Sequence, residues 1–330
     1  MTAKKRILSG MRPTGRLHLG HLVGALNNWV KLQDDYQCFY MIADWHALMS
    51  EYADPKLMKE SCREMVRDFV ASGLDPEKSV IFVQSHVPEH LELAMVFSDI
   101  TPLAWVERIP TYKEQLREIK GRDLTTYGFL GYPILQAADI AVYKAGAVPV
   151  GVDQVPHLEL TREIIRRFNG LYETRLFPEP EAILTRTPKL LGIDNRKMSK
   201  SYANFIALSD TPEVIKKKVS VMITDPARIK LTDKGCPAVC NVFSYFSTFA
   251  KPGDTAKVKD WCEGALRGCT ECKRNLADIL IEVLEPIRSR RGKMPDSEVE
   301  DIIADGARRS RKAAGETMAE VRKLVNLMAQ

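Results

Sequence analysis

Short apolar runs and longer amphipathic stretches alternate along the first half of the chain. A short apolar strand that ends in glycine is predicted at residues 6–10, and a further short strand at residues 147–151. The continuous apolar run at residues 38–43 and the stretch at residues 79–84 predict buried strands. Apolar residues recur at three- and four-residue steps from His18 onward and again across residues 55–72 and 155–169, which predicts helices. Strand–helix–strand alternation is typical of an α/β fold, so we expect a parallel sheet with helices on both faces.

The pattern changes after Ser201, where helical periodicity continues without further strand signals. Helices are predicted at residues 211–221, 242–250, 275–288, 297–304 and 313–328. We therefore expect two domains, an α/β domain at residues 1–204 and an α-helical domain at residues 205–330.

Composition adds few restrictions. Hydrophobic residues make up 45% and charged residues 28% of the 330 residues, which is ordinary for a soluble globular protein. No apolar run approaches the ~18–20 residues that span a bilayer, and the start lacks the apolar core of a secretory signal. A cytoplasmic location is expected.

The net charge of +5 is mildly basic and permits a nucleic-acid partner without requiring one. Basic residues gather at residues 189–200, 216–218 and 288–293. Each cluster alone is as consistent with a solvated face, but together they favour a polyanionic partner.

A first candidate site is His18-Leu19-Gly20-His21, where a predicted strand and loop lead into a helix. The free N–H groups of a helix N-terminus attract anions, and Gly20 allows a nucleotide to approach the backbone. His18 and His21 lie three residues apart and could donate to phosphate oxygens as negative charge develops. Two surface histidines beside a flexible glycine is the simpler alternative, since a tetrapeptide is a weak signal.

A second candidate site is the loop Lys197-Met198-Ser199-Lys200-Ser201. Lys197 and Lys200 can both reach one polyphosphate, and the serine hydroxyls add neutral donors. An exposed basic loop is the alternative, but it does not explain why this pentapeptide follows the first motif in this order.

Together the two motifs resemble the signature sequences of class I aminoacyl-tRNA synthetases, and the tryptophanyl family most closely. The likeness includes Arg12-Pro13-Thr14-Gly15, Ala43-Asp44-Trp45-His46, the segment from Tyr132 to Asp139, and Gly151-Val152-Asp153-Gln154. It implies a Rossmann-like catalytic domain and a helical anticodon-binding domain. It also implies activation of an amino acid by ATP with Mg²⁺, transfer to tRNA(Trp), and a homodimer.

The resemblance also assigns residues to ATP. The expected contacts are Arg12, Pro13, Thr14, Gly20, His21, Gly151, Val152, Asp153, Gln154, Leu190, Lys197, Met198, Ser199, Lys200 and Ser201. Among these and their neighbours, His18, His21, Lys197 and Lys200 are expected to act on the reacting phosphates.

Asp139 stands inside an apolar helical segment, where a carboxylate is costly unless it is paired. A helix cap or core salt bridge is one interpretation. The resemblance implies instead that Asp139 accepts a hydrogen bond from the indole N–H of tryptophan. It also implies that Tyr132, Gln136, His46 and Lys113 bind the ammonium and carboxylate groups of that substrate.

The tyrosyl family is the closest rival, because the segment from Tyr132 to Asp139 resembles its amino-acid site as well. Leu8 favours tryptophan, because tyrosyl enzymes place a phenol-binding tyrosine at the end of the first strand. A nucleotidyltransferase with the first motif would lack the lysine loop. A non-catalytic RNA-binding relative should have lost signature residues, which are present here.

Five of the seven cysteines fall between Cys236 and Cys272, whereas Cys38 and Cys62 are expected to be packing residues. Clustered cysteines in a cytosolic protein favour metal over disulfides. Cys240, Cys262, Cys269 and Cys272 resemble the ligands of a 4Fe–4S cluster found in a subset of tryptophanyl enzymes, although the first gap is one residue shorter. Zinc and no metal are alternatives, and Cys236 is an alternative ligand.

Overall fold

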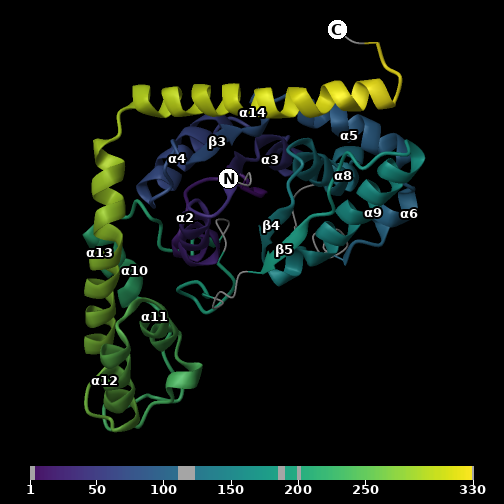
Figure 1. Ribbon diagram of the computed structural model, residues 1–330. Coiled ribbons are helices and arrows are strands. Elements are labelled where there is room, and N and C mark those ends of the chain that lie inside the picture. The colour runs from purple at the N-terminus through teal and green to yellow at the C-terminus, as the bar shows by residue number, and fades with distance from the viewer. Residues whose placement is uncertain (1–3, 111–122, 185–189, 199–201, 329–330) are drawn as a thin grey trace. The chain divides into compact units, whose positions relative to one another are not determined.

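A computed structural model describes residues 4–110, 123–184, 190–198 and 202–328 (Figure 1). The chain forms two compact units. The first unit consists of Met1–Gly15, Asn28–Arg186 and Pro295–Gln330, and the second unit of Arg16–Asn27 and Thr187–Met294. In the described part of the chain, no helix is long and apolar enough to cross a membrane.

The first unit is built on a parallel sheet in the order β3-β2-β1-β4-β5. Its strands are β1 (Arg6–Met11), β2 (Gln37–Ile42), β3 (Ser79–Val83), β4 (Ala147–Val150) and β5 (Glu181–Leu184). The register pairs Leu8 with Phe39 and Phe39 with Val80. β1 lies in the middle, so the chain builds outward from it to both edges. The predicted parallel α/β fold is confirmed.

Helices cover both faces of this sheet. Leu8, Phe39 and Phe82 project into a core shared with α5 (Glu89–Ile100), α8 (Tyr127–Val142) and α9 (Val155–Leu171). On the other face, Trp29 of α2 (Asn27–Leu32) stacks on Tyr40 at 4.6 Å and meets Phe69 of α4 (Met58–Ala71) edge-on. Two shorter helices, α3 (Asp44–Glu51) and α6 (Leu103–Glu107), also belong to the first unit.

The last helix, α14 (Asp296–Leu324), belongs to the first unit and runs along the edge strand β3 and α5 (Figure 1). Two separate helices at residues 297–304 and 313–328 were predicted, and this was wrong, because the helix is continuous. Its buried face passes through Gly306 and Ser310, which are too small or too polar to continue an apolar stripe. Gly306 lets the helix lie directly on the backbone of Ile81.

The second unit is mainly helical. It starts with α1 (Leu19–His21) and the π-helical turn η1 (Leu22–Leu26), and it continues with α10 (Pro212–Ser220), α11 (Asn241–Phe249), α12 (Pro252–Glu263) and α13 (Cys269–Lys293). Helix α13 extends beyond the predicted 275–288, and α12 was missed because Val258 is its only buried residue. Helix α10 packs along α13.

Candidate active site

The carboxyl ends of the strands in the first unit carry several of the segments that the sequence singled out. Arg12 follows β1, Asp44 and His46 follow β2, and Gly151 follows β4. β1 and β4 are neighbours from which the chain continues toward opposite edges of the sheet. Ligands of open α/β sheets bind outside the carboxyl ends of the strands at such a switch point. The first unit therefore presents its predicted nucleotide segments where this fold binds ligands.

The segment Gly151-Val152-Asp153-Gln154 forms a tight turn between β4 and α9. Gly151 precedes the 3₁₀ turn η3 (Val152–Gln154), and α9 then begins with a proline in its first turn. A Cβ at Gly151 would lie 2.6 Å from Asp153 Oδ1, so a larger residue here would displace the Asp153 side chain. Val152 is 72% exposed and Asp153 is also exposed, so both are accessible to a ligand.

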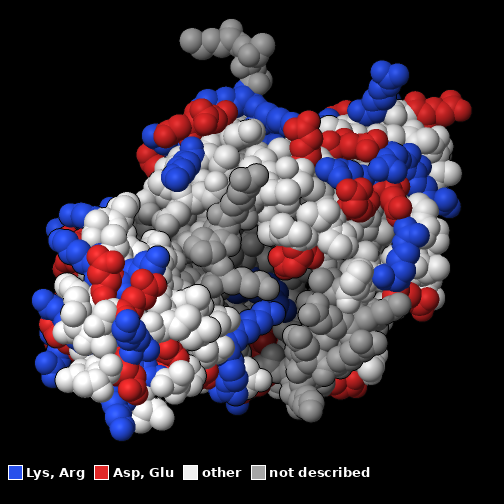
Figure 2. All heavy atoms as spheres, turned by 90° about the horizontal axis from the view of Figure 1, so that it is seen from below, with Lys and Arg blue, Asp and Glu red and all other residues white. Residues whose placement is uncertain are grey.

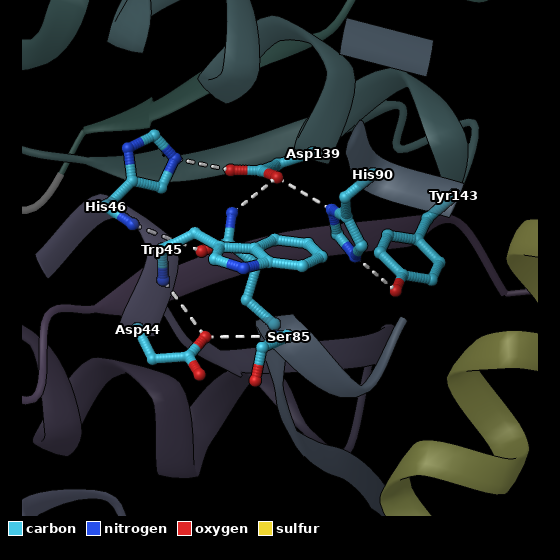
Figure 3. Close-up of polar contacts among 8 residues, drawn as sticks. Asp44, Trp45, His46, Ser85, His90, Asp139 and Tyr143 are labelled. Carbon is cyan, nitrogen blue, oxygen red and sulfur yellow. Dashed lines mark hydrogen bonds and ion pairs between the residues drawn. The ribbon is translucent and has the colours of Figure 1, made fainter. Parts of the chain in front are cut away.

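Asp139 of α8 is the centre of a buried polar cluster (Figure 3). It accepts hydrogen bonds from His46 Nε2 at 2.7 Å, Gln84 Nε2 at 2.8 Å and His90 Nδ1 at 2.6 Å. His46 and Gln84 stand at the carboxyl ends of β2 and β3, and His90 comes from α5. Three separate elements thus converge on one carboxylate at the ligand-binding edge of the sheet.

The electrostatics of this cluster keep Asp139 ionised. Burial raises the pKa of its carboxyl group, but the charge and hydrogen bonds of His46 and His90 outweigh burial and lower the pKa to about 2. With Asp139 only 1% exposed, the cluster holds a fixed negative charge out of water. A buried carboxylate of this kind can recognise a substrate donor.

Other residues predicted to bind the amino acid lie in the same unit. Tyr132 donates or accepts a 2.7 Å hydrogen bond with His157 Nε2, and Gln136 is half-buried. Burial lowers the pKa of His157 to about 4, against a smaller raising effect of Asp153, so its ring is neutral near pH 7. Leu8 is buried in the core below the site. Lys113 lies outside the described residues.

Gln84, His90 and Tyr143 were not singled out from the sequence. His90 is fully buried, and its Nε2 lies 2.8 Å from the Tyr143 hydroxyl. A histidine within an apolar helix was the available signal, comparable to the aspartate in α8. A second carboxylate oxygen, Asp44 Oδ1, accepts from the N–H groups of Trp45 and Ser85 and ties the β2 and β3 ends together (Figure 3).

In the second unit, the two signature motifs come together. A Cβ at Gly20 would lie 3.2 Å from Met198 Sδ, and Leu19 N–H donates to the carbonyl of Ile206. His18 Nδ1 accepts from Gly20 N–H and His21 Nδ1 accepts from His18 N–H. Because Nδ1 accepts in both rings, their neutral forms carry the proton on Nε2. Each ring is thus set to donate from Nε2.

The lysine loop starts from a rigid base in the same unit. Leu191 and Lys197 form an antiparallel bridge, and Asn204 Nδ2 donates to Asp194 at 2.7 Å. From α11, Asn241 Nδ2 donates to Gly192 O at 2.7 Å and Tyr245 OH donates to Leu191 O at 2.6 Å. Lys197 is exposed, and Leu190, which precedes Leu191 in the sequence, is half-buried. Ser199, Lys200 and Ser201 lie outside the described residues.

Comparison with known proteins identifies the family. Residues 1–285 match the family model described as tRNA synthetases class I (W and Y). A tryptophan–tRNA ligase of Thermotoga maritima is 53% identical, covering 98% of this chain and 99% of that protein. A tryptophan–tRNA ligase of Aquifex aeolicus is 43% identical, covering 98% of this chain and all of that protein.

A solved structure agrees. The crystal structure of tryptophanyl-tRNA synthetase from Campylobacter jejuni, complexed with ADP and tryptophan, has a TM-score of 0.88 at 31% identity. It covers 98% of this chain and 100% of its own. The chain belongs to the class I tRNA synthetases of the W and Y family.

In this synthetase the cysteines divide into a group and an outlier. Burial raises the pKa of Cys240, Cys262 and Cys272. Neighbouring thiols, Cys269 among them in each case, raise these three pKa values further. Cys236 is exposed and is not among these neighbours. Gly235 accommodates the group, because a Cβ there would lie 2.5 Å from Cys262 Sγ. Cys38 and Cys62 are buried in the first unit as expected.

The four grouped thiols are of the right kind and number for a tetrathiolate site. Within the described residues, however, no three His, Cys, Asp or Glu side chains are arranged so that they could hold a metal ion.

The basic clusters of this synthetase are partly neutralised. Lys218 pairs with Asp210 at 2.6 Å, and Arg288 pairs with Glu285. Lys216 and Lys217 remain exposed on α10. Over the face seen in Figure 2, Lys and Arg are interspersed with Asp and Glu rather than gathered into one field. A polyanion would therefore be bound at selected positions rather than over a uniformly basic surface.

Proposed function

We propose that the chain is a tryptophan–tRNA ligase. It activates L-tryptophan with ATP to tryptophanyl-adenylate and pyrophosphate, and it then esterifies tRNA(Trp). The observation that carries the choice of amino acid is Asp139, a buried and ionised acceptor at the ligand-binding edge of the sheet. Such an acceptor rejects phenylalanine, which has no polar hydrogen to donate, and the buried Leu8 in place of a phenol-binding tyrosine favours tryptophan over tyrosine.

ATP is held by the backbone and side chains of both motifs. The residues proposed to contact the nucleotide are Arg12, Pro13, Thr14, Gly20, His21, Gly151 to Gln154, Leu190 and Met198. Mg²⁺ accompanies the phosphates as part of the substrate. The tryptophan carboxylate attacks the α-phosphorus, the bond to the pyrophosphate oxygen breaks, and pyrophosphate leaves.

The charge that develops on the phosphates is stabilised by donors. His18 and His21 donate from Nε2, because each Nδ1 is already occupied as an acceptor. Lys197 and Lys200 follow the departing pyrophosphate as mobile point charges, and Ser199 and Ser201 donate from their hydroxyls. The residues act by positioning and charge stabilisation, as in other phosphoryl-type transfers.

For the amino acid, the ammonium and carboxylate groups are bound by Tyr132, Gln136, His46 and Lys113. His46 also forms a hydrogen bond with Asp139, the proposed acceptor for the indole N–H. Leu8 lies under this end and supplies apolar packing in place of a phenol-binding hydroxyl.

We also propose that residues 205–330 form the tRNA-binding part of the enzyme and that the protein works in the cytoplasm as a homodimer. Cys240, Cys262, Cys269 and Cys272 would hold a 4Fe–4S cluster, with zinc as the alternative. Such a group would have a structural role, clipping the loop before α11 to the start of α13.

The proposed activity is tested by ATP–pyrophosphate exchange with purified protein and tryptophan, tyrosine or phenylalanine. Exchange with tryptophan alone is expected. Exchange with tyrosine would keep the family but transfer the assignment to the tyrosyl branch. Absence of exchange with all three, in folded protein, would leave a non-catalytic RNA-binding role.

A further inference from the structure

The two oxygens of Asp139 are used unequally. Oδ1 accepts from both Gln84 Nε2 at 2.8 Å and His90 Nδ1 at 2.6 Å. Oδ2 accepts only from His46 among the described residues, at 2.7 Å. A carboxylate oxygen offers about two lone-pair sites, so Oδ1 is saturated and Oδ2 has one acceptor site left.

The remaining acceptor site is on the accessible side of the cluster. The side chain of His46, next to Oδ2, is 11% exposed, whereas that of His90, next to Oδ1, is fully buried. Figure 3 shows His46 and His90 on opposite sides of the Asp139 carboxylate. A substrate donor that approaches from the side of His46 therefore meets Oδ2, with His90 on the far side.

Tyr143 holds the far side of His90. An ionised carboxylate can only accept, so His90 Nδ1 carries the proton it donates to Asp139. On the other side of the ring, Nε2 lies 2.8 Å from the Tyr143 hydroxyl, which can both donate and accept. Burial raises the pKa of the Tyr143 phenol well above its usual value, and the charges of Asp139 and Glu89 raise it further. A hydrogen bond with Ser310 has a smaller, lowering effect, so the phenol keeps its proton.

Packing leaves these two side chains little freedom. His90 lies 5.9 Å from the Phe82 ring and 5.3 Å from the Tyr143 ring, and Tyr143 stacks on Phe39 at 4.5 Å. His90 and Tyr143 are both fully buried. A donor held in this way cannot turn to follow Asp139, so it fixes where the carboxylate points.

We infer that His90, with Tyr143 behind it, is a positioning residue for amino-acid recognition, which saturates Oδ1 and so directs Oδ2 toward the indole N–H of the substrate. The inference rests on the proposed function, because it assumes that tryptophan is the amino acid. His90 acts through Asp139 and does not touch the substrate.

The test compares tryptophan with β-(3-benzothienyl)alanine, an analogue in which sulfur replaces the indole N–H, in pyrophosphate exchange. The variants are His90→Leu, which removes the donor, His90→Asn, which keeps an N–H near the position of Nδ1, and Tyr143→Phe. Tyr40→Phe is the matched control, since it deletes a buried hydroxyl that donates to Trp29 O on the other face of the sheet.

In wild type, kcat/KM should strongly favour tryptophan over the analogue. His90→Leu should lower this ratio by roughly tenfold to a hundredfold through the tryptophan value, with an unchanged KM for ATP. His90→Asn should recover part of the ratio, Tyr143→Phe should lower it less than His90→Leu does, and Tyr40→Phe should leave it unchanged.

An unchanged ratio in folded His90→Leu, or equal losses for the two amino acids, would show that His90 is only structural. If His90→Leu does not fold, an unchanged ratio in both His90→Asn and Tyr143→Phe would overturn the inference. Wild type that fails to activate tryptophan would instead refute the proposed function itself, so the two failures are distinguishable.

Discussion

Gly306 determines how closely α14 approaches the sheet, and its replacement by alanine should show this. A Cβ at Gly306 would overlap the carbonyl oxygen of Ile81 and lie 2.7 Å from its carbon and 3.3 Å from Phe82 Cα. These are backbone atoms of the edge strand, so no rotamer change can relieve the overlap. Helix α14 must move outward, which weakens the bonds of Arg309 to the carbonyls of Pro76 and Ser79.

The magnitude follows from two opposing effects. Overpacking against atoms that cannot rotate away costs about 3 kcal/mol, at the upper end of the usual range. Alanine in a helix interior gains about 1 kcal/mol over glycine. Gly306→Ala should therefore lower the free energy of unfolding by about 2 kcal/mol.

Gly315→Ala is the matched control, because Gly315 lies in the same helix and a Cβ there would meet nothing within 4 Å. It should stabilise the protein by up to about 1 kcal/mol. Urea unfolding followed by tryptophan fluorescence is a suitable assay, since Trp29, Trp45 and Trp105 report on the first unit. Equal shifts for the two variants, or stabilisation by Gly306→Ala, would refute the close approach of α14 to β3.

Two further outcomes concern the second unit. Tyr245→Phe removes the hydrogen bond to Leu191 O at the base of the lysine loop, so it should raise the KM for ATP severalfold and leave the KM for tryptophan unchanged. The control Tyr40→Phe deletes a comparable bond in the first unit and should change neither KM. An equal effect of the two variants would contradict this role of α11. Cys240→Ser should reduce the iron or zinc content of anaerobically purified protein, and Cys236→Ser should not. The reason is that Cys240, unlike Cys236, neighbours the other thiols. The reverse result would make Cys236 the ligand.

The sequence predicted the strands with buried apolar residues and missed the one without them. Strands β2 and β3 are recognisable as continuous apolar runs, and β1 and β4 contain shorter ones. The edge strand β5 is four half-exposed or exposed residues without such a run. The continuity of α14 was missed for a related reason, because close packing through Gly306 and Ser310 leaves no hydrophobic signal.

The domain arrangement also follows from contacts that a linear pattern does not contain. Helix α14 lies far along the chain from β3, yet it packs on that strand, so the compact units do not divide at one point in the sequence. The predicted division at residue 204 is a functional one, and it stays a prediction.

The active-site residues also divide into those that the sequence identifies and those that only the packing of the chain reveals. Asp139 was identifiable because a carboxylate in an apolar helix needs a partner. The identity of those partners was not, because Gln84 and His90 meet it only when α5, α8 and the end of β3 are packed together. His46 was singled out, but its hydrogen bond to Asp139 depends on the same packing.

Asp139→Asn tests the central claim most directly, with tryptophan and β-(3-benzothienyl)alanine compared in pyrophosphate exchange. Gln84 and His90 both donate to Oδ1, so the asparagine oxygen should turn toward them and its NH₂ toward the substrate. The N–H of tryptophan would then face another donor, while the analogue would lose little. Asp68→Asn, at a buried carboxylate on α4, controls for neutralisation alone. We predict that Asp139→Asn abolishes most of the preference for tryptophan and that Asp68→Asn preserves it. An unchanged preference in folded Asp139→Asn would contradict the account.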